Sequence, residues 1–141
     1  YRFHPSWDED LAAMRMVNDH VESLDQLLDA VERLQAEFVQ SERSDVLWHR
    51  VAAIGSAQSR PALQAVLAQK QREQTAAFEE MIRSLQAKGI AGASIDVHAA
   101  AVFLQAFTFG RILSILDGTD SLSPVEWSRT ARRAVEAVLR G

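Results

Sequence analysis

The sequence of 141 residues contains no cysteine and only three prolines and six glycines. Without cysteine the chain forms no disulfide and offers no thiolate for catalysis or metal binding. The scarcity of proline and glycine, with abundant Ala, Leu, Gln, Glu and Arg, favours helix over sheet. A chain of this length is one domain with a substantial core. We therefore expect an all-α protein of a single domain.

An excess of positive charge is also missing, because 15 Lys and Arg stand against 19 Asp and Glu, a formal net charge of −4. Nucleic-acid affinity requires positive charge that neutralises phosphates, so this chain alone is not expected to hold DNA. No uninterrupted apolar run reaches the roughly 20 residues of a membrane-spanning helix, and no signal peptide opens the chain. We expect a soluble cytoplasmic protein that contacts no membrane. Because Tyr1 is not an initiator Met, we expect a further segment upstream.

Motifs for catalysis and metal binding are lacking as well. The histidines at 4, 20, 49 and 98 form no ligand motif: His20 and His49 fall opposite the apolar stripes of their helices, and His98 falls in a first turn. No serine occupies a strand-to-helix turn, and no glycine-rich loop would hold a phosphate. We therefore expect surface histidines, no enzymatic activity and no metal or other cofactor.

Apolar residues recur at spacings of three and four, which predicts six helices and no strand. We expect four helices at about residues 6–20, 23–40, 60–88 and 96–117. A further helix follows the polar break at 41–44 and ends near 55–58, and the last begins at 123. Ser6, Asp96 and Ser123 are expected N-caps, and Gly89 followed by Ile90 is an expected helix stop. Short connections between such helices predict an antiparallel helical bundle.

The stretch from Ala99 to Phe109 has only Gln105 and Thr108 as polar residues. A helix that is apolar nearly all round is buried on more than one side. We expect one face of this helix to close the chain's own core, and another to pack on a second copy of the protein or around an apolar ligand.

The apolar stripe of the long helix at 60–88 is interrupted by Lys70 and Gln74. One interpretation is that the helix overhangs the core there and both side chains reach solvent along their stems. The other is a polar spot in a cavity.

Three segments resemble the C-terminal ligand-binding and dimerisation domain of TetR-type transcriptional regulators. The opening YRFHPSWDEDL resembles the junction at which the DNA-reading helix ends and the connecting helix begins. The segment LWHRVAAIGSAQSRPALQAVLAQKQREQTAAFEEMIRSLQAKGI is similar to the middle of that domain, where a proline-started long helix ends in glycine and an aliphatic residue. The segment DVHAAAVFLQAFTFGRI resembles its Asp-started, Ala-rich helix with a late glycine.

This resemblance implies a sensor domain over residues 1–141, with residues 1–5 as a remnant of an upstream helix-turn-helix domain. A small apolar effector would bind inside the helical body, and the last two helices would form a four-helix interface with a second subunit. The homodimer would then contact DNA only through the missing N-terminal domains, set at the spacing of successive major grooves. Effector binding would change that spacing through the helix that begins at Ser6.

Two sets of residues are candidates for these roles. The pocket candidates are large, mostly apolar and placed beside the main stripes: Trp48, Gln74, Phe78, Met81, Phe103 and Phe107. The candidates for the dimer interface lie on the last two helices: Leu104, Thr108, Arg111, Ile115, Trp127, Ala131, Ala134 and Val138.

Each set has a simpler alternative. The large side chains could pack as ordinary core, and the last helix could cover its own domain, with Arg111 paired inside the chain. The alternative function is a helical adaptor that binds other proteins and no small molecule. The interruption at Lys70 and Gln74 and the aromatic-rich second face of the fifth helix separate the two functions, because a sensor requires an apolar cavity of roughly 300 to 1,000 Å³ and an adaptor has no reason to be hollow.

Overall fold

The computed structural model describes residues 6–40, 44–117 and 122–141, which form seven helices and, within these ranges, no strand. The helices are α1 (Ser6–His20), α2 (Leu24–Gln40), α3 (Ser44–Ala57), α4 (Pro61–Ala87), α5 (Val97–Phe109), α6 (Ile112–Leu116) and α7 (Pro124–Arg140). The all-helical class is confirmed. The expected remnant at residues 1–5 lies outside the described residues.

Side-chain caps fix the starts of the last two long helices where the sequence predicted them. The Asp96 carboxylate accepts a hydrogen bond from the Ala99 N–H at 2.7 Å, and Ser123 Oγ accepts one from the Glu126 N–H at 3.3 Å. Each cap satisfies a donor that has no partner within the helix itself. The predicted N-caps Asp96 and Ser123 are therefore confirmed, whereas Ser6 already belongs to α1.

The end of α4 confirms the predicted glycine stop. Gly89 has a φ of +75°, its N–H donates to Gln86 O at 3.0 Å, and the Ile90 N–H donates to Leu85 O at 2.8 Å. These two bonds form a Schellman motif, in which a left-handed residue reverses the chain and the next apolar residue packs back. Ile90 is buried accordingly.

Gly89→Ala is expected to destabilise the protein by about 1 kcal/mol, because an L-residue is strained at this φ. A Cβ at Gly89 would meet no atom within 4 Å, so strain and not a clash accounts for the loss. Urea unfolding of the two proteins measures the difference. An unchanged midpoint would show that the turn relaxes without cost.

The expected fifth helix is two helices in the structure, because the chain turns at Gly110. The Gly110 N–H still donates to Ala106 O at 2.8 Å, whereas the Arg111 N–H donates to Thr108 O at 3.4 Å, a tighter turn. Glycine permits such a local change in helix direction. The prediction of one continuous helix to residue 117 is therefore wrong at this point.

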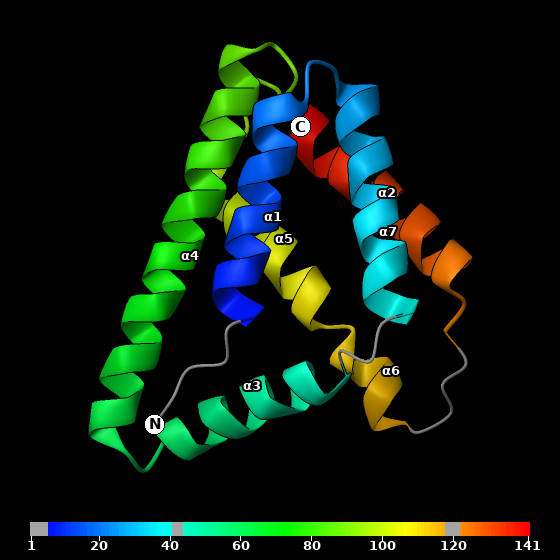
Figure 1. Ribbon diagram of the computed structural model, residues 1–141. Helices are drawn as coiled ribbons and strands as arrows, with labels where there is room; N and C mark the ends of the chain where they lie inside the picture. Colours follow the sequence, from blue (N-terminus) through cyan, green and yellow to red (C-terminus); the bar gives the residue numbers. More distant parts are fainter. Residues whose placement is uncertain (1–5, 41–43, 118–121) are drawn as a thin grey trace.

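Figure 1 shows α1 and α2 in front of α5 and α7, with α4 along one side and α3 across the lower end. α7 packs chiefly on α2, and α4 packs on α5, α1 and α3. Arg132 of α7 reinforces the first pair through ion pairs with Asp29 at 2.6 Å and Glu32 at 3.1 Å on α2. These ion pairs hold α7 against α2.

The main core lies where α1 ends, α2 begins, α4 ends, α5 begins and α7 ends, at the upper end of Figure 1. Its buried members are Val21, Leu27, Leu28, Ile82, Leu85, Ile90, Ala91, Ala100, Ala101, Leu104, Val135 and Leu139. Lys88 joins two of these helix ends, because its Nζ donates to the carbonyls of Asn18 at 2.8 Å and Val21 at 3.0 Å. A cation at these carbonyls also complements the helix dipole of α1.

Candidate functional site

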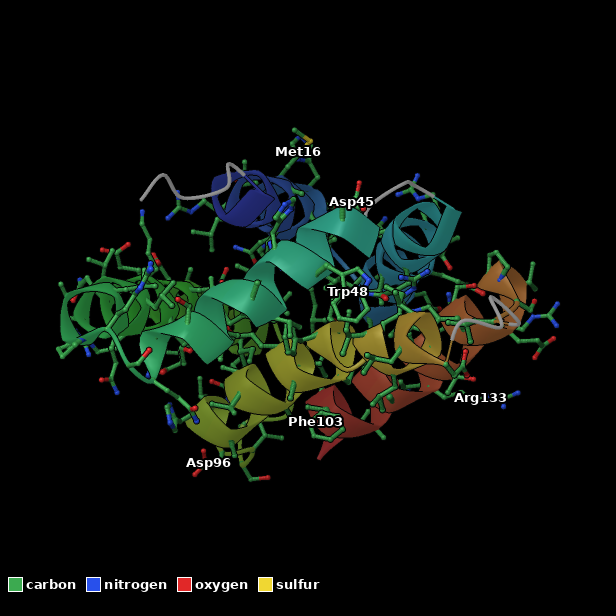
Figure 2. The ribbon with its side chains drawn as sticks, turned by 90° about the horizontal axis from the view of Figure 1, so that it is seen from below. Met16, Asp45, Trp48, Asp96, Phe103 and Arg133 are labelled. Carbon is green, nitrogen blue, oxygen red and sulfur yellow. The ribbon has the colours of Figure 1, made fainter. Side chains whose placement is uncertain are left out.

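One face of α5 is apolar and exposed. Val102 and Phe103 are 46% and 49% exposed, and Ala99 and Ala106 beside them on the helix are exposed too. Figure 2 shows Phe103 on the side formed by α5 and α7, away from Met16 on α1. We call Ala99, Val102, Phe103 and Ala106 the α5 face. A cluster of exposed apolar side chains of this kind is a candidate interaction surface.

Aromatic contacts connect the α5 face to α7. The rings of Phe103 and Phe107 are stacked with centroids 6.4 Å apart, and Phe107 lies 6.3 Å from Trp127 of α7. Trp127 is held in turn by a hydrogen bond from its Nε1 to Gln35 Oε1 of α2 at 2.8 Å. Phe107 therefore links the α5 face to Trp127 of α7.

The structure places the predicted interface residues at different depths. Leu104, Arg111 and Ala131 are buried within the chain, at 6%, 7% and 2% exposure. The remaining five are half-buried: Thr108, Ile115, Trp127, Ala134 and Val138. Leu104 belongs to the core, so the side of α5 that the prediction turned outward faces inward.

The predicted pocket residues are only partly brought together. Gln74, Phe78 and Met81 share α4 and are half-buried, and Phe78, Met81 and Phe107 pack against the main core. Trp48 is 41% exposed on α3, a helix that contacts α4 and α6. Phe103 lies instead on the exposed α5 face.

A polar cluster joins the middle of α4 to α5. Gln71 Nε2 donates to Gln105 Oε1 at 2.8 Å, and Gln105 Nε2 donates to Thr75 Oγ1 at 3.0 Å. Next to it on α4, Gln74 Oε1 is buried without a hydrogen-bond partner, although a buried acceptor normally has one. The presence of Gln105 in an otherwise apolar run was the signal that could have predicted this cluster.

Lys70 and Gln74 differ in their surroundings. Lys70 Nζ lies 4.0 Å from Glu73 Oε2, in an ion pair whose two side chains are 36% and 51% exposed. For Lys70 this is the overhanging arrangement that we gave as the simpler interpretation. Gln74 retains the polar-spot interpretation because its acceptor is buried.

A hollow of about 260 Å³ lies between α1 and α4. It is lined by side chains of both helices: Met14, Arg15, Asn18, Asp19, Ala77, Glu80, Met81 and Ser84. Of the predicted pocket residues it includes Met81, and its walls are more polar than the apolar cavity that we expected. We call this hollow the α1–α4 groove.

The histidines of the described chain make separate contacts. His20 Nδ1 lies 2.8 Å from Met16 O, and His98 Nδ1 lies 3.0 Å from Glu79 Oε1. Within the described ranges, no group of three or more His, Cys, Asp or Glu side chains could hold a metal ion. His4 lies outside the described residues.

Glu79 couples α4 to the start of α5. Its carboxylate is contacted by His98 at 3.0 Å and by Arg83 at 3.1 Å, and these hydrogen bonds lower the pKa of Glu79, that of His98 contributing most. Because the pKa of Glu79 is lower in the folded protein than its usual value of 4.5, the ionised carboxylate stabilises the folded state at pH values above about 4.5. This stabilisation is lost as the pH falls through the lower pKa of the folded protein.

Glu79→Gln is therefore expected to lower the free energy of unfolding at pH 7 and to flatten its decline between pH 5 and pH 3. Urea unfolding across this pH range measures both. Parallel pH curves for the two proteins would show that Glu79 contributes nothing to acid sensitivity.

The stretch Val97–Leu116, which covers α5 and α6, is by length and composition able to cross a membrane, and only 28% of it is buried. Counted across its polar residues it reaches 20 residues, which corrects the expectation drawn from uninterrupted runs. Core helices of soluble proteins have the same length and composition.

Comparisons with protein-family models, with curated proteins and with solved structures give no match to this chain.

Proposed function

We propose that this chain is the effector-binding and dimerisation domain of a TetR-like transcriptional regulator. The α5 face is the observation that carries the proposal, because Val102 and Phe103 expose apolar area on a helix whose other side, at Ala100, Ala101 and Leu104, packs in the core. The resemblance of the three sequence segments supplies the family. DNA would be bound by an upstream helix-turn-helix domain.

A second copy of the chain is the partner that fits this surface. In a two-fold dimer the same patch lies on both subunits, so α5 and α7 of each would form a four-helix interface. Aromatic residues are enriched at the centres of protein interfaces, and Phe103 stacks on Phe107, which in turn contacts Trp127. Ala99 and Ala106 would let the facing helix approach closely. The proposed interface therefore centres on Phe103 and includes the flanking Trp127, Ala134 and Val138.

The effector half of the proposal is supported by the region around the polar cluster. The donors of Gln71 and Gln105 are used within the cluster, whereas Gln74 Oε1 has no donor. An apolar effector that carries one hydroxyl or amide N–H would satisfy this acceptor, and the half-exposed Trp48 would supply apolar area.

Coupling to DNA would operate through α1. Lys88 holds the end of α1 on the end of α4, so the opposite end of α1 is the one that a shift of α4 would displace. To release DNA, the effector must bind one arrangement of the DNA-reading heads more tightly than the other.

A soluble cytoplasmic location belongs to the same proposal. The apolar stretch Val97–Leu116 turns at Gly110 and contains the buried Arg111. A charged side chain at the centre of a bilayer costs about 2.5 to 3.5 kcal/mol on insertion scales. These features favour a dimer face over a membrane span.

Native mass spectrometry of the purified domain tests the sensor function. A dimer that carries an additional small-molecule mass, lost from a Gln74→Leu variant that keeps its fold, is the expected result. A ligand-free protein, with an unchanged spectrum after addition of an apolar alcohol library, would contradict effector binding.

The alternative function is a helical adaptor without a small-molecule ligand. The same α5 face favours it, because an amphipathic helix of another protein would bury Val102 and Phe103 equally well. The adaptor requires a monomer with a free face, whereas the sensor requires a dimer. The mass of the isolated domain in solution therefore separates them.

A further inference from the structure

Apolar and charged side chains of both helices line the α1–α4 groove. Met14 of α1 and Met81 of α4 give it an apolar wall on each helix. Arg15, Asp19 and Glu80 give it charges of both signs. A volume of about 260 Å³ corresponds to about nine water molecules at roughly 30 Å³ each, so a ligand of about nine non-hydrogen atoms fits.

The charged side chains of the groove, Arg15, Asp19 and Glu80, are exposed to solvent. Arg15 and Asp19 stand four residues apart on α1, a spacing at which ion pairs commonly form. Within the described part of the chain, however, neither they nor Glu80 makes an ion pair. Asn18 also lines the groove, and its Oδ1 is buried without a hydrogen-bond partner among the described residues.

We propose that the α1–α4 groove binds a small zwitterion, of the size of a free amino acid with an apolar side chain. Its carboxylate pairs with Arg15, its ammonium is held by Asp19 and Glu80, and its apolar part lies between the two methionines. A simple cation would be repelled by Arg15, and a simple anion by the two carboxylates. A ligand with both charges pairs with the groups of both signs.

This site is distinct from the proposed effector region and does not depend on the sensor function. It shares only Met81 with the predicted pocket residues. An occupant would bridge α1 and α4 beside the link that Lys88 makes to Asn18 O. Binding would therefore hold α1 against α4, whether or not the chain is a transcriptional regulator.

The three methionines of the chain provide the measurement. In ¹³C-methyl NMR spectra, L-leucine is expected to shift the Met14 and Met81 signals saturably, with a Kd of about 1 mM or below, and to leave Met16 unchanged. Met16 is the internal reference because it lies on α1 but is 65% exposed and outside the groove. Two probes isolate the charges: 3-methylbutylamine lacks the carboxylate, and 4-methylpentanoate lacks the ammonium. Both are expected to bind at least tenfold more weakly.

Arg15→Gln and Glu80→Gln are each expected to raise the Kd for L-leucine at least tenfold. Arg133→Gln on α7, an exposed arginine outside the groove, is the matched control and is expected to leave it unchanged. Circular dichroism confirms that the variants fold. The proposal is overturned if L-leucine shifts neither groove methionine up to about 20 mM, if a singly charged probe binds equally, or if Arg15→Gln has no effect.

Discussion

Replacing Phe103 by aspartate is expected to convert a dimer of this domain into a folded monomer. The ring is 49% exposed at the centre of the α5 face and becomes buried only when that face is covered. Losing a central aromatic anchor costs about 2 kcal/mol or more, and a two-fold interface contains it twice. The Kd of the dimer should therefore rise about 10³-fold or more, because each 1.4 kcal/mol is tenfold. Sedimentation velocity at micromolar concentrations measures the change.

Met16→Asp is the matched control for this substitution. Met16 is even more exposed, at 65%, and lies on the side of the molecule opposite Phe103 in Figure 2. It introduces the same charge without touching the α5 face, and the dimer should persist. Equal sedimentation of the two variants would contradict the assignment of the interface.

Leu85→Ala is expected to cause the largest loss of stability, about 2 to 5 kcal/mol. Leu85 has no exposed area, and it lies in the main core together with the similarly enclosed Ile82. Its backbone carbonyl also accepts the Ile90 N–H, so the side chain lies where α4 ends and the chain reverses. Removing it leaves a cavity that dense packing cannot close without moving α4.

Urea unfolding at a fixed protein concentration measures this loss, because dimerisation makes apparent stability depend on concentration. Val66→Ala on the same helix is the control. Val66 is 44% exposed, and its truncation should change the free energy of unfolding by less than about 0.5 kcal/mol. Similar losses in the two variants would show that the core is misplaced.

Helix ends were predictable from the sequence because caps are local. Asp96 and Ser123 bond to N–H groups three residues on, and Gly89 supplies the one left-handed residue that ends α4. These signals depend on a few neighbouring residues, and no distant partner alters them.

The orientation of α5 was not predictable in the same way. Its stretch is apolar on nearly every side, so the spacing defines several equivalent stripes and does not say which one faces inward. The polar residues decide it in the structure: Gln105 bonds to Thr75 of α4, which turns Leu104 inward and leaves Phe103 outside. That choice depends on a partner 30 residues away.

The stripe of α7 that packs inside the chain was not predictable for a related reason. The spacing indicated Trp127, Ala131, Ala134 and Val138 as a dimer face, whereas the residues buried within the chain are Ser128, Ala131, Val135 and Leu139. α2 covers this side, and Arg132 pairs with Asp29 and Glu32 there. Neighbouring stripes on one helix differ little in apolar character, so the partner helix determines which one is buried.

The mass of the unmodified domain in solution tests the central claim most directly. Sedimentation velocity across micromolar concentrations should give twice the chain mass of 15.7 kDa, because two copies cover each other's α5 face. A species of 15.7 kDa at every concentration would leave that face uncovered and contradict the dimeric sensor.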